Sequence, residues 1–441
     1  MKIGLIAMSG IRACDTELLE LGLTLPGFVE RSKQIASLPS LGLLTLAGMT
    51  PAEHDVHYIE VPDLAAEGET LEPFDLVAIS SYSAQINEGY ELARRYRATG
   101  VPVVMGGTHV TALPEEALQH CTSVVIGEGE ASWPVVLADA ENGALKSYYG
   151  SYDVGFDLAD APMPAFELLD LSKYNRLTVQ TSRGCPHRCE FCAGSNLISS
   201  RYKQKPIAKV LAEIDRICAL WEHPFIEFAD DNSFVNRAYW KKLLPQLKQR
   251  RIKWFTETDL SVAHDPELLR LMRESGCAQV LIGLESPTAA PLDHLEQNSN
   301  WKHARFAEYK ASIRTIQSHG ITVNGCFIVG LDGQTSAVFD DIYDFVRDAE
   351  LYEVQITILT PFPGTPLYAR LEREGRLVGP ANWKRCTLFD LNFIPQDMSA
   401  KELVKGFHQL AMKLYSDSFT QWRRERFKQN LRHSIARRRA A

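Results

Sequence analysis

Three cysteines lie close together in the stretch TSRGCPHRCEFCAG, residues 181–194. They are Cys185, Cys189 and Cys192. Thiolates are ligands for zinc and for iron–sulfur clusters, and paired thiols form disulfides. Three thiolates around a four-iron cluster leave one iron without a protein ligand, and such an iron can chelate a substrate or cofactor directly. The spacing therefore raises four alternatives: a disulfide, a zinc ion, an iron–sulfur cluster or a chance grouping.

The remaining cysteines argue against a disulfide framework. The chain has nine cysteines, an odd number, and a pairing within this loop would leave one thiol over. Zinc prefers four ligands in spaced pairs, and the loop offers only His187 besides its thiols. These residues favour an iron–sulfur cluster. The cysteines outside the loop are scattered at Cys14, Cys121, Cys218, Cys277, Cys326 and Cys386.

Alternating strand and helix patterns surround the cysteine loop. We expect residues 176–375 to form a partial (β/α)6 barrel, because short apolar runs alternate there with helical patterns. The cysteines follow its first strand, where the loops of such barrels carry chemistry. The expected strands lie near 177–182, 225–229, 253–257, 279–284, 323–329 and 353–359. The expected helices lie near 206–221, 237–250, 265–275, 303–318 and 335–350.

The first 140 residues show a second βα series. Runs such as KIGLIAM, DLVAISS and PVVMGG end in polar residues or glycine. They predict an N-terminal Rossmann-like, doubly wound parallel sheet that binds ligands beyond the carboxyl ends of its strands. Glycines there either admit a bulky or phosphorylated ligand or simply make tight turns. The residues at these strand ends are Ser80, Ser81, Gly106, Gly107, Thr108, Gly127, Glu128 and Gly129.

The rest of the chain carries weaker signals. We expect a linker at 141–175 and a helical C-terminal extension at 376–441 with a basic end. The net charge of −8 argues against a nucleic-acid partner. No membrane-spanning stretch or signal peptide is apparent, so we expect a cytoplasmic protein. The basic tail is either a peripheral membrane contact or a solvated helix end.

The cysteine loop, with Phe191 before its third cysteine, resembles the signature of the radical S-adenosylmethionine (SAM) superfamily. The resemblance implies a 4Fe–4S cluster on Cys185, Cys189 and Cys192, with SAM on the fourth iron. Reduction of the cluster would cleave SAM to a 5′-deoxyadenosyl radical, which abstracts hydrogen from an unactivated carbon. It also implies an electron donor such as flavodoxin or ferredoxin.

Segments after later strands resemble the SAM-binding positions of the superfamily. They are EFADDNSF, VLIGLES and GCFIVGLDGQT. For the acidic pair in the first segment, the alternative is a cap on the following helix. Cys326 and Gln334 depart from the Gly and Glu that are common at their positions. The implied SAM-binding residues are Phe191, Asp230, Asp231, Glu285, Ser286, Ile328 and Gly330.

The front domain resembles the cobalamin-binding domain that precedes the radical barrel in one subgroup of this superfamily. The phrases SLPSLGLLTLAG, VVMGGTHVTALPEEAL and VVIGEGE carry the resemblance, which implies that the strand-end residues above bind cobalamin. The Asp-x-His-x-x-Gly motif that supplies a cobalt ligand in many such domains is replaced by SGIRACDTELLELG, which has no histidine. The alternative is a cobalamin-type fold without cobalamin. His109 is expected to be a loop or ligand-edge residue.

The subgroup resemblance implies methylation of an unactivated carbon in a small metabolite or lipid. One alternative is a cyclase, oxidoreductase or rearrangement enzyme without methyl transfer. Another is a non-catalytic cofactor-binding sensor, which the complete cysteine loop and Glu285 argue against. The sequence does not identify the substrate.

Overall fold

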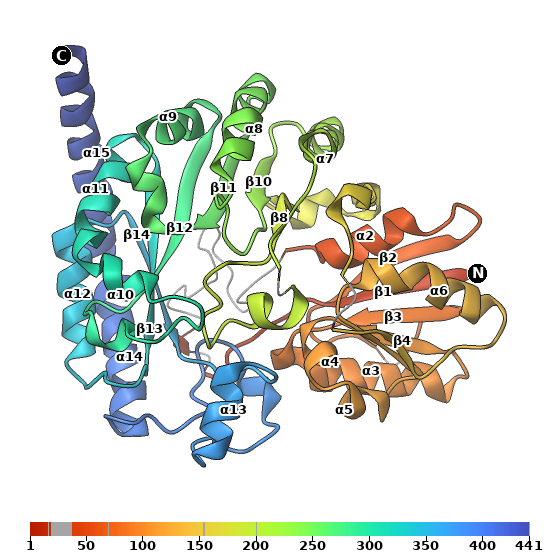
Figure 1. The fold of residues 1–441 in the computed structure, drawn as a ribbon. Helices are drawn as coiled ribbons and strands as arrows, with labels where there is room; N and C mark the ends of the chain where they lie inside the picture. Colours follow the sequence, from red (N-terminus) through yellow and green to blue (C-terminus); the bar gives the residue numbers. More distant parts are fainter. Residues whose placement is uncertain (16, 19–37, 69, 153–154, 200, 441) are drawn as a thin grey trace.

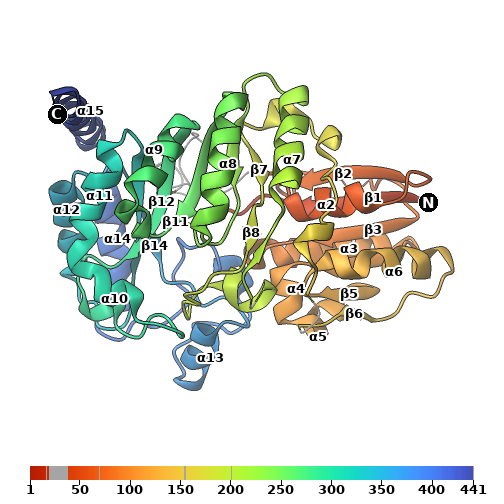
Figure 2. The same cartoon turned by 45° about the horizontal axis from the view of Figure 1, so that its top comes forward.

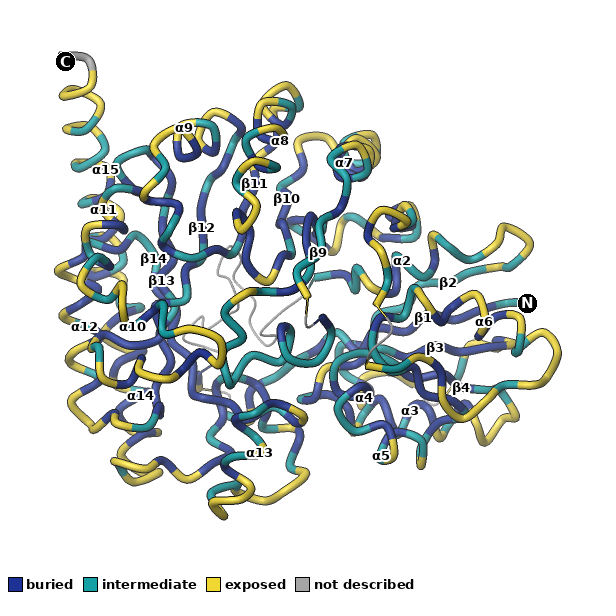
Figure 3. The backbone as a smooth tube through the Cα atoms, viewed as in Figure 1, coloured by how far each residue is buried: buried dark blue, intermediate teal, exposed yellow. Residues whose placement is uncertain are grey.

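The computed structural model describes residues 1–15, 17–18, 38–68, 70–152, 155–199 and 201–440. Two six-stranded sheets lie beside each other, each with its own helices (Figure 1). The strands are mostly buried, and the exposed residues gather on the outer sides of the helices and in loops (Figure 3). This layering confirms the expected α/β architecture.

The first sheet is entirely parallel and has the order β2-β1-β3-β4-β5-β6. Its strand order changes direction at β1, as in doubly wound folds. The last strand, β6, lies within the segment expected to be a linker. The strands are β1 (Lys2–Met8), β2 (Asp55–Val61), β3 (Leu76–Ser80), β4 (Val103–Gly106), β5 (Ser123–Ile126) and β6 (Tyr148–Gly150).

Helices cover both faces of this sheet (Figure 1). Two of them, α2 and α6, contact each other on one face, and Trp133 of α6 is buried there with Leu43 of α2. Ser40 caps the start of helix α2, where its hydroxyl accepts a hydrogen bond from the Leu43 amide (3.4 Å). The helices are α2 (Leu41–Met49), α3 (Ile86–Ala98), α4 (Thr108–Ala112), α5 (Pro114–Leu118) and α6 (Gly129–Glu141).

The second sheet is a partial barrel of parallel strands in the order β7-β10-β11-β12-β13-β14. Consecutive strands of this sheet are joined through helices on its outer side (Figure 2). The strands are β7 (Leu177–Val179), β10 (Phe225–Phe228), β11 (Lys253–Thr258), β12 (Cys277–Glu285), β13 (Thr322–Val329) and β14 (Glu353–Ile358). The helices are α7 (Ile207–Leu220), α8 (Arg237–Arg250), α9 (Pro266–Glu274), α10 (Trp301–Arg305), α11 (Tyr309–Ser318) and α12 (Val338–Ala349).

Alternation along the barrel strands separates apolar from polar residues. Phe228 of β10 and Trp254 of β11 pack on Trp240 of helix α8, so these positions face the outer helices. Because successive side chains of a strand point to opposite faces, Glu227 and Glu257 face the inside of the barrel. The inner face of the barrel therefore carries carboxylates, whereas the outer face carries the apolar side chains that form the core with the helices.

The C-terminal region packs on both halves of the molecule. Trp383 is buried against the first domain, and its indole Nε1 donates to Glu116 Oε1 (3.0 Å). The buried Arg423 in α15 donates to the Leu414 carbonyl (3.2 Å), and Phe419 and Phe427 are buried on the same helix. The apolar side of the basic tail therefore packs on the barrel. The helices here are α13 (Pro366–Arg373), α14 (Ala400–Leu414) and α15 (Asp417–Ala440).

No helix among the described residues combines the length and the apolar character needed to cross a membrane.

Candidate functional site

The cysteine loop leaves the barrel just after β7 and the short strand β8 (Ser182–Arg183). A turn brings the Cys192 amide to the Cys189 carbonyl (3.1 Å). The Asn196 side chain then donates from Nδ2 to the carbonyls of Cys189 (2.9 Å) and Cys192 (2.6 Å). Asn196 thus fixes the backbone between two cysteines. Sequence reasoning missed it, because nothing in the motif marks an asparagine four residues further on.

The three thiols suit a positively charged iron cluster. All three are partly buried and unpaired, and burial raises the pKa of Cys185 to about 11. The neighbouring Cys192 thiol raises the pKa of both Cys185 and Cys189 further, which places the three side chains close together. Without a cation these thiols keep their protons, and coordination to iron would stabilise the thiolates. Among the described residues, no group of three His, Cys, Asp or Glu side chains is arranged for a single metal ion.

Asp230 and Asp231 follow β10 and have different surroundings. The buried Asp230 carboxylate accepts hydrogen bonds from the Thr181 amide (2.7 Å) and the Ser182 amide (2.9 Å), and from the hydroxyls of Thr181 and Ser233. Asp231 is exposed to a cavity, and one of its oxygens accepts from the Gly184 amide (2.7 Å). Asp230 therefore holds the start of the cysteine loop, while Asp231 is open to a ligand.

Neither aspartate caps the next helix. The cap of helix α8 is Asn236, whose side-chain oxygen accepts a hydrogen bond from the Tyr239 amide (3.1 Å). Capping of helix α8 therefore does not explain the acidic pair.

Glu285 ends β12 at a β-bulge, with its backbone in the left-handed region (φ 64°). Its carboxylate is paired with the buried Lys302, whose Nζ lies 2.6 Å from Oε1. Ser286, which follows, is fully buried, and its hydroxyl accepts from the Thr288 amide (3.2 Å). Left-handed non-glycine residues are uncommon and occur where the surroundings impose them.

The end of β13 is organised by Gln334. Its Oε1 accepts from the amides of Gly330 (2.8 Å) and Leu331 (3.2 Å), and its Nε2 donates to the Ile328 carbonyl (3.1 Å). Gln334 thus performs a structural role in the loop in which the sequence departs from the family pattern. Ile328 is buried, and Phe191 packs in part against the same core.

Glu257 of β11 is an inner-face carboxyl that the sequence motifs did not indicate. Burial raises its pKa to about 8, and the carboxylates of Glu227, Asp231 and Glu285 contribute to the rise. These four groups therefore lie near one another at the open end of the barrel. Only the alternation of the strand marks Glu257 in the sequence.

A cavity of about 570 Å³ lies between the two sheets, within the range of cofactor sites. Seven of the eight predicted strand-end residues line it. Ser81 does not: its hydroxyl donates to the backbone of Tyr82, and Tyr82 lines the cavity in its place. The residues lining the cavity from the predicted set are Ser80, Gly106, Gly107, Thr108, Gly127, Glu128 and Gly129.

The lining of this cavity suits a large cofactor. Gly107 lies on its wall with a positive φ (104°), and a Cβ there would lie 3.3 Å from Ser80 Oγ. The first sheet and helices α2 and α6 give the cavity an apolar slot, lined by Leu43, Val104 and Trp133. The barrel contributes Thr178, Gln180, Glu227 and Asp231 to the opposite wall.

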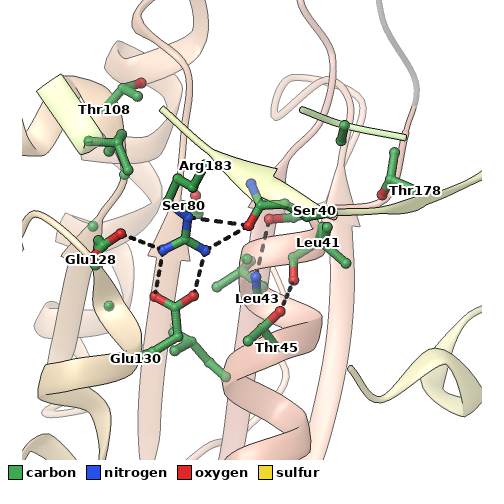
Figure 4. Close-up of a pocket in the computed structure, with 18 of the residues that line it drawn as sticks. Ser40, Leu41, Leu43, Thr45, Ser80, Thr108, Glu128, Glu130, Thr178 and Arg183 are labelled. Carbon is green, nitrogen blue, oxygen red and sulfur yellow. Dashed lines mark hydrogen bonds and ion pairs between the residues drawn. The ribbon is translucent and has the colours of Figure 1, made fainter. Parts of the chain in front are cut away.

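Arg183 crosses this cavity from the start of the cysteine loop to the first domain (Figure 4). Its guanidinium pairs with Glu128 Oε1 (2.8 Å) and Glu130 Oε1 (2.8 Å) and also bonds Gln180. Lys203 pairs with the second oxygen of Glu128 (2.5 Å). Glu128, predicted to touch cobalamin, is therefore engaged in joining the two domains.

His109 faces away from the cavity. It is buried, with Nδ1 2.9 Å from Ser83 Oγ and Nε2 3.3 Å from Glu116 Oε1, and its ring contacts Trp383. It is a core residue of the first domain, where the sequence had indicated a loop or ligand-edge position.

Comparison with known proteins agrees with this arrangement. Family models match residues 36–137 (B12 binding domain), 179–346 (radical SAM superfamily) and 365–441 (a domain of unknown function, DUF4070). The hopanoid C-2 methylase of Rhodopseudomonas palustris is 30% identical over 357 residues, covering 79% of this chain and 67% of that protein. The bacteriochlorophyllide d C-12(1)-methyltransferase of Chlorobaculum tepidum is 27% identical, covering 87% and 83%.

The fold also matches a solved structure. The radical SAM methyltransferase TsrM from Kitasatospora setae, with cobalamin and a [4Fe-4S] cluster bound, superposes with a TM-score of 0.67 at 14% identity over the whole of both chains.

The chain belongs to the radical SAM superfamily, among the enzymes that carry an N-terminal B12-binding domain. Its cofactors are accordingly a 4Fe–4S cluster, SAM and cobalamin.

Proposed function

We propose that this enzyme methylates an unactivated carbon of a small metabolite or lipid. The observation that carries the proposal is the shared cavity, whose walls come from both the cobalamin-type domain and the open end of the barrel. A substrate there would face both cofactor sites. When bound, the cluster and SAM supply hydrogen-atom abstraction, and cobalamin supplies a methyl carrier.

Each group of residues then has a defined task. Cys185, Cys189 and Cys192 hold the cluster, and Asn196 fixes their loop. Asp231 offers a carboxylate to the ammonium group of SAM, since it is open to the cavity, and Glu285 offers one to the ribose hydroxyls. The glycine-rich strand ends and the apolar slot beside Trp133 hold cobalamin.

The cavity wall favours a substrate with a large apolar part. Leucine, isoleucine and proline side chains form a large part of it beside the polar and charged lining residues; the apolar lining residues include Leu41, Leu46, Leu158, Pro162 and Ile198. The hopanoid and bacteriochlorophyllide methylases above support the same class.

A labelled methyl group tests the proposal without a known substrate. The reconstituted enzyme is incubated anaerobically with cobalamin, reductant and SAM carrying a CD3 group, and cobalamin is analysed by mass spectrometry. Methyl transfer predicts CD3-cobalamin. Formation of 5′-deoxyadenosine with no label on cobalamin would contradict the methyltransferase proposal and favour a cyclase, oxidoreductase or rearrangement.

We also propose flavodoxin or ferredoxin as the electron donor, and peripheral membrane contact through the exposed arginines of α15. Removing residues 421–441 should lower binding to anionic vesicles while wild-type protein binds. Equal binding of the full-length and truncated proteins to the vesicles would contradict the membrane contact.

A further inference from the structure

Lys302 is a buried lysine whose ammonium group donates hydrogen bonds to the end of β12. Its side chain is 10% exposed, and its Nζ donates to Glu285 Oε1 (2.6 Å) and to the Gly283 carbonyl (2.8 Å). A buried ammonium is tolerated where ion pairs and hydrogen bonds offset its loss of hydration. Here both partners lie at the strand end where the proposed function places the ribose of SAM.

These two contacts bracket the bulge in β12. Gly283 is paired with Cys326 and Glu285 with Phe327, so the residue between them is left out of register. The left-handed backbone of Glu285 is unfavourable for a side chain that bears a Cβ. Lys302 bonds the backbone before the bulge and the carboxylate after it, and so fixes the direction of that carboxylate. The second oxygen of Glu285 has no hydrogen-bond partner among the described residues.

The same lysine is tied to the cysteine loop. Helix α10 begins beneath the Glu296 carboxylate, whose Oε2 accepts from the amides of Trp301 (2.5 Å) and Lys302 (3.3 Å). Glu296 forms an antiparallel β-bridge with Cys189, and the Glu190 amide donates to the Leu295 carbonyl (3.0 Å). Cys189 and Glu285 are therefore connected through one short segment, 295–302.

We propose that Lys302 is a positioning residue for SAM, acting through Glu285. It binds one oxygen of that carboxylate and leaves the other for the ribose hydroxyls. It also fixes the position of the ribose site relative to the cysteine loop. This inference rests on the proposed function, because it assumes that Glu285 binds SAM.

Equilibrium dialysis of radiolabelled SAM against the reconstituted enzyme tests this role independently of turnover. Lys302→Met should weaken SAM binding by about tenfold or more, as loss of a supporting contact typically does, while iron content stays near wild type. Its melting temperature should fall, because the buried Glu285 carboxylate loses its partner. Lys302→Arg, which can still reach the carboxylate, should recover part of the affinity. Lys310→Met is the matched control, because Lys310 forms an exposed pair with Asp348.

A double-variant cycle decides whether Lys302 acts through Glu285. Lys302→Met combined with Glu285→Gln should bind SAM no more weakly than Glu285→Gln alone. This pair also removes both buried charges, so it stays informative if the single lysine variant is unstable.

Additive losses in that cycle would overturn the proposal, as would wild-type SAM affinity in Lys302→Met or no recovery in Lys302→Arg. Absence of SAM binding to the wild-type reconstituted enzyme would instead contradict the proposed function itself.

Discussion

Arg183 lies two residues before Cys185, and its Nη1 is 2.8 Å from Oε1 of Glu128 in the first domain. The ion pair joins the start of the cysteine loop to the cavity wall formed by the first domain. Since Glu128 is almost fully buried, the pair is shielded from solvent. The distance between the two cofactor regions is thereby fixed by side chains as well as by the chain connection.

Loss of this pair should destabilise the enzyme. Arg183→Met leaves Glu130 without its arginine partner and Glu128 with Lys203 alone, and breaking a buried pair costs about 3 kcal/mol. The urea midpoint should fall clearly. Arg94→Met, which removes an exposed pair with Glu91, should change stability by less than about 1 kcal/mol. Equal midpoints for the two variants would contradict a structural role for the Arg183 pairs.

Substitutions of the two aspartates after β10 should have different effects, one on stability and the other on SAM binding. Asp230→Asn removes acceptors from buried donors and should lower the unfolding free energy by about 2 kcal/mol. Asp231→Asn should leave stability nearly unchanged and weaken SAM binding, because this carboxylate faces the cavity. Urea unfolding and SAM dialysis on both variants measure the two effects. The reverse pattern would refute these assignments.

Glu257 should give stability a distinctive pH dependence. Its pKa is raised to about 8 in the folded protein, above the value of a glutamate in an unfolded chain, near 4.3. The folded state therefore binds the extra proton, and stability falls as pH rises from about 4 to about 8. Glu257→Gln removes this fall, so the variant should gain stability over wild type between pH 5 and pH 8.5.

Urea midpoints at several pH values measure that difference, and Glu267→Gln controls for loss of an exposed carboxylate. A constant difference between wild type and Glu257→Gln across this range would show that Glu257 is ionised throughout.

Cobalamin binding should require glycine at position 107 but not at position 100. Both have positive φ (104° and 87°), so alanine strains the backbone at each by about 1–2 kcal/mol. At Gly107 the added methyl would also crowd Ser80 beside the cavity, whereas nothing lies within 4 Å at Gly100. After reconstitution and gel filtration, only Gly107→Ala should have lost bound cobalamin, judged by visible absorbance. Equal retention by both variants would argue that cobalamin does not approach this strand end.

Local patterns in the sequence predict much of this molecule. The six barrel strands fall close to their expected positions because each is a short apolar run bounded by polar residues. The three cysteines and Glu285 could be proposed as site residues from the sequence because their motifs are local. Ser81 and Tyr82 show the limit, since a shift of one position decides which side chain faces the cavity.

Other features depend on contacts between distant residues. Arg183 meets Glu130 across 53 positions, and Lys302 meets Glu285 across 17, so no short motif contains either pair. Asp230 and Asp231 are adjacent and chemically identical, and only the surrounding amides distinguish their roles. Glu257 acquires its raised pKa first from burial and then from three carboxylates on other segments of the barrel.

The most direct test of the central claim is 5′-deoxyadenosine formation, measured by liquid chromatography and mass spectrometry after anaerobic incubation with SAM and a reductant. Wild-type enzyme with a reconstituted cluster should form it. Cys185→Ala, Cys189→Ala and Cys192→Ala should each abolish both the cluster and the product while the first domain stays folded. Absence of 5′-deoxyadenosine from the cluster-loaded wild type, or equal amounts from a cysteine variant, would contradict radical SAM chemistry at this loop.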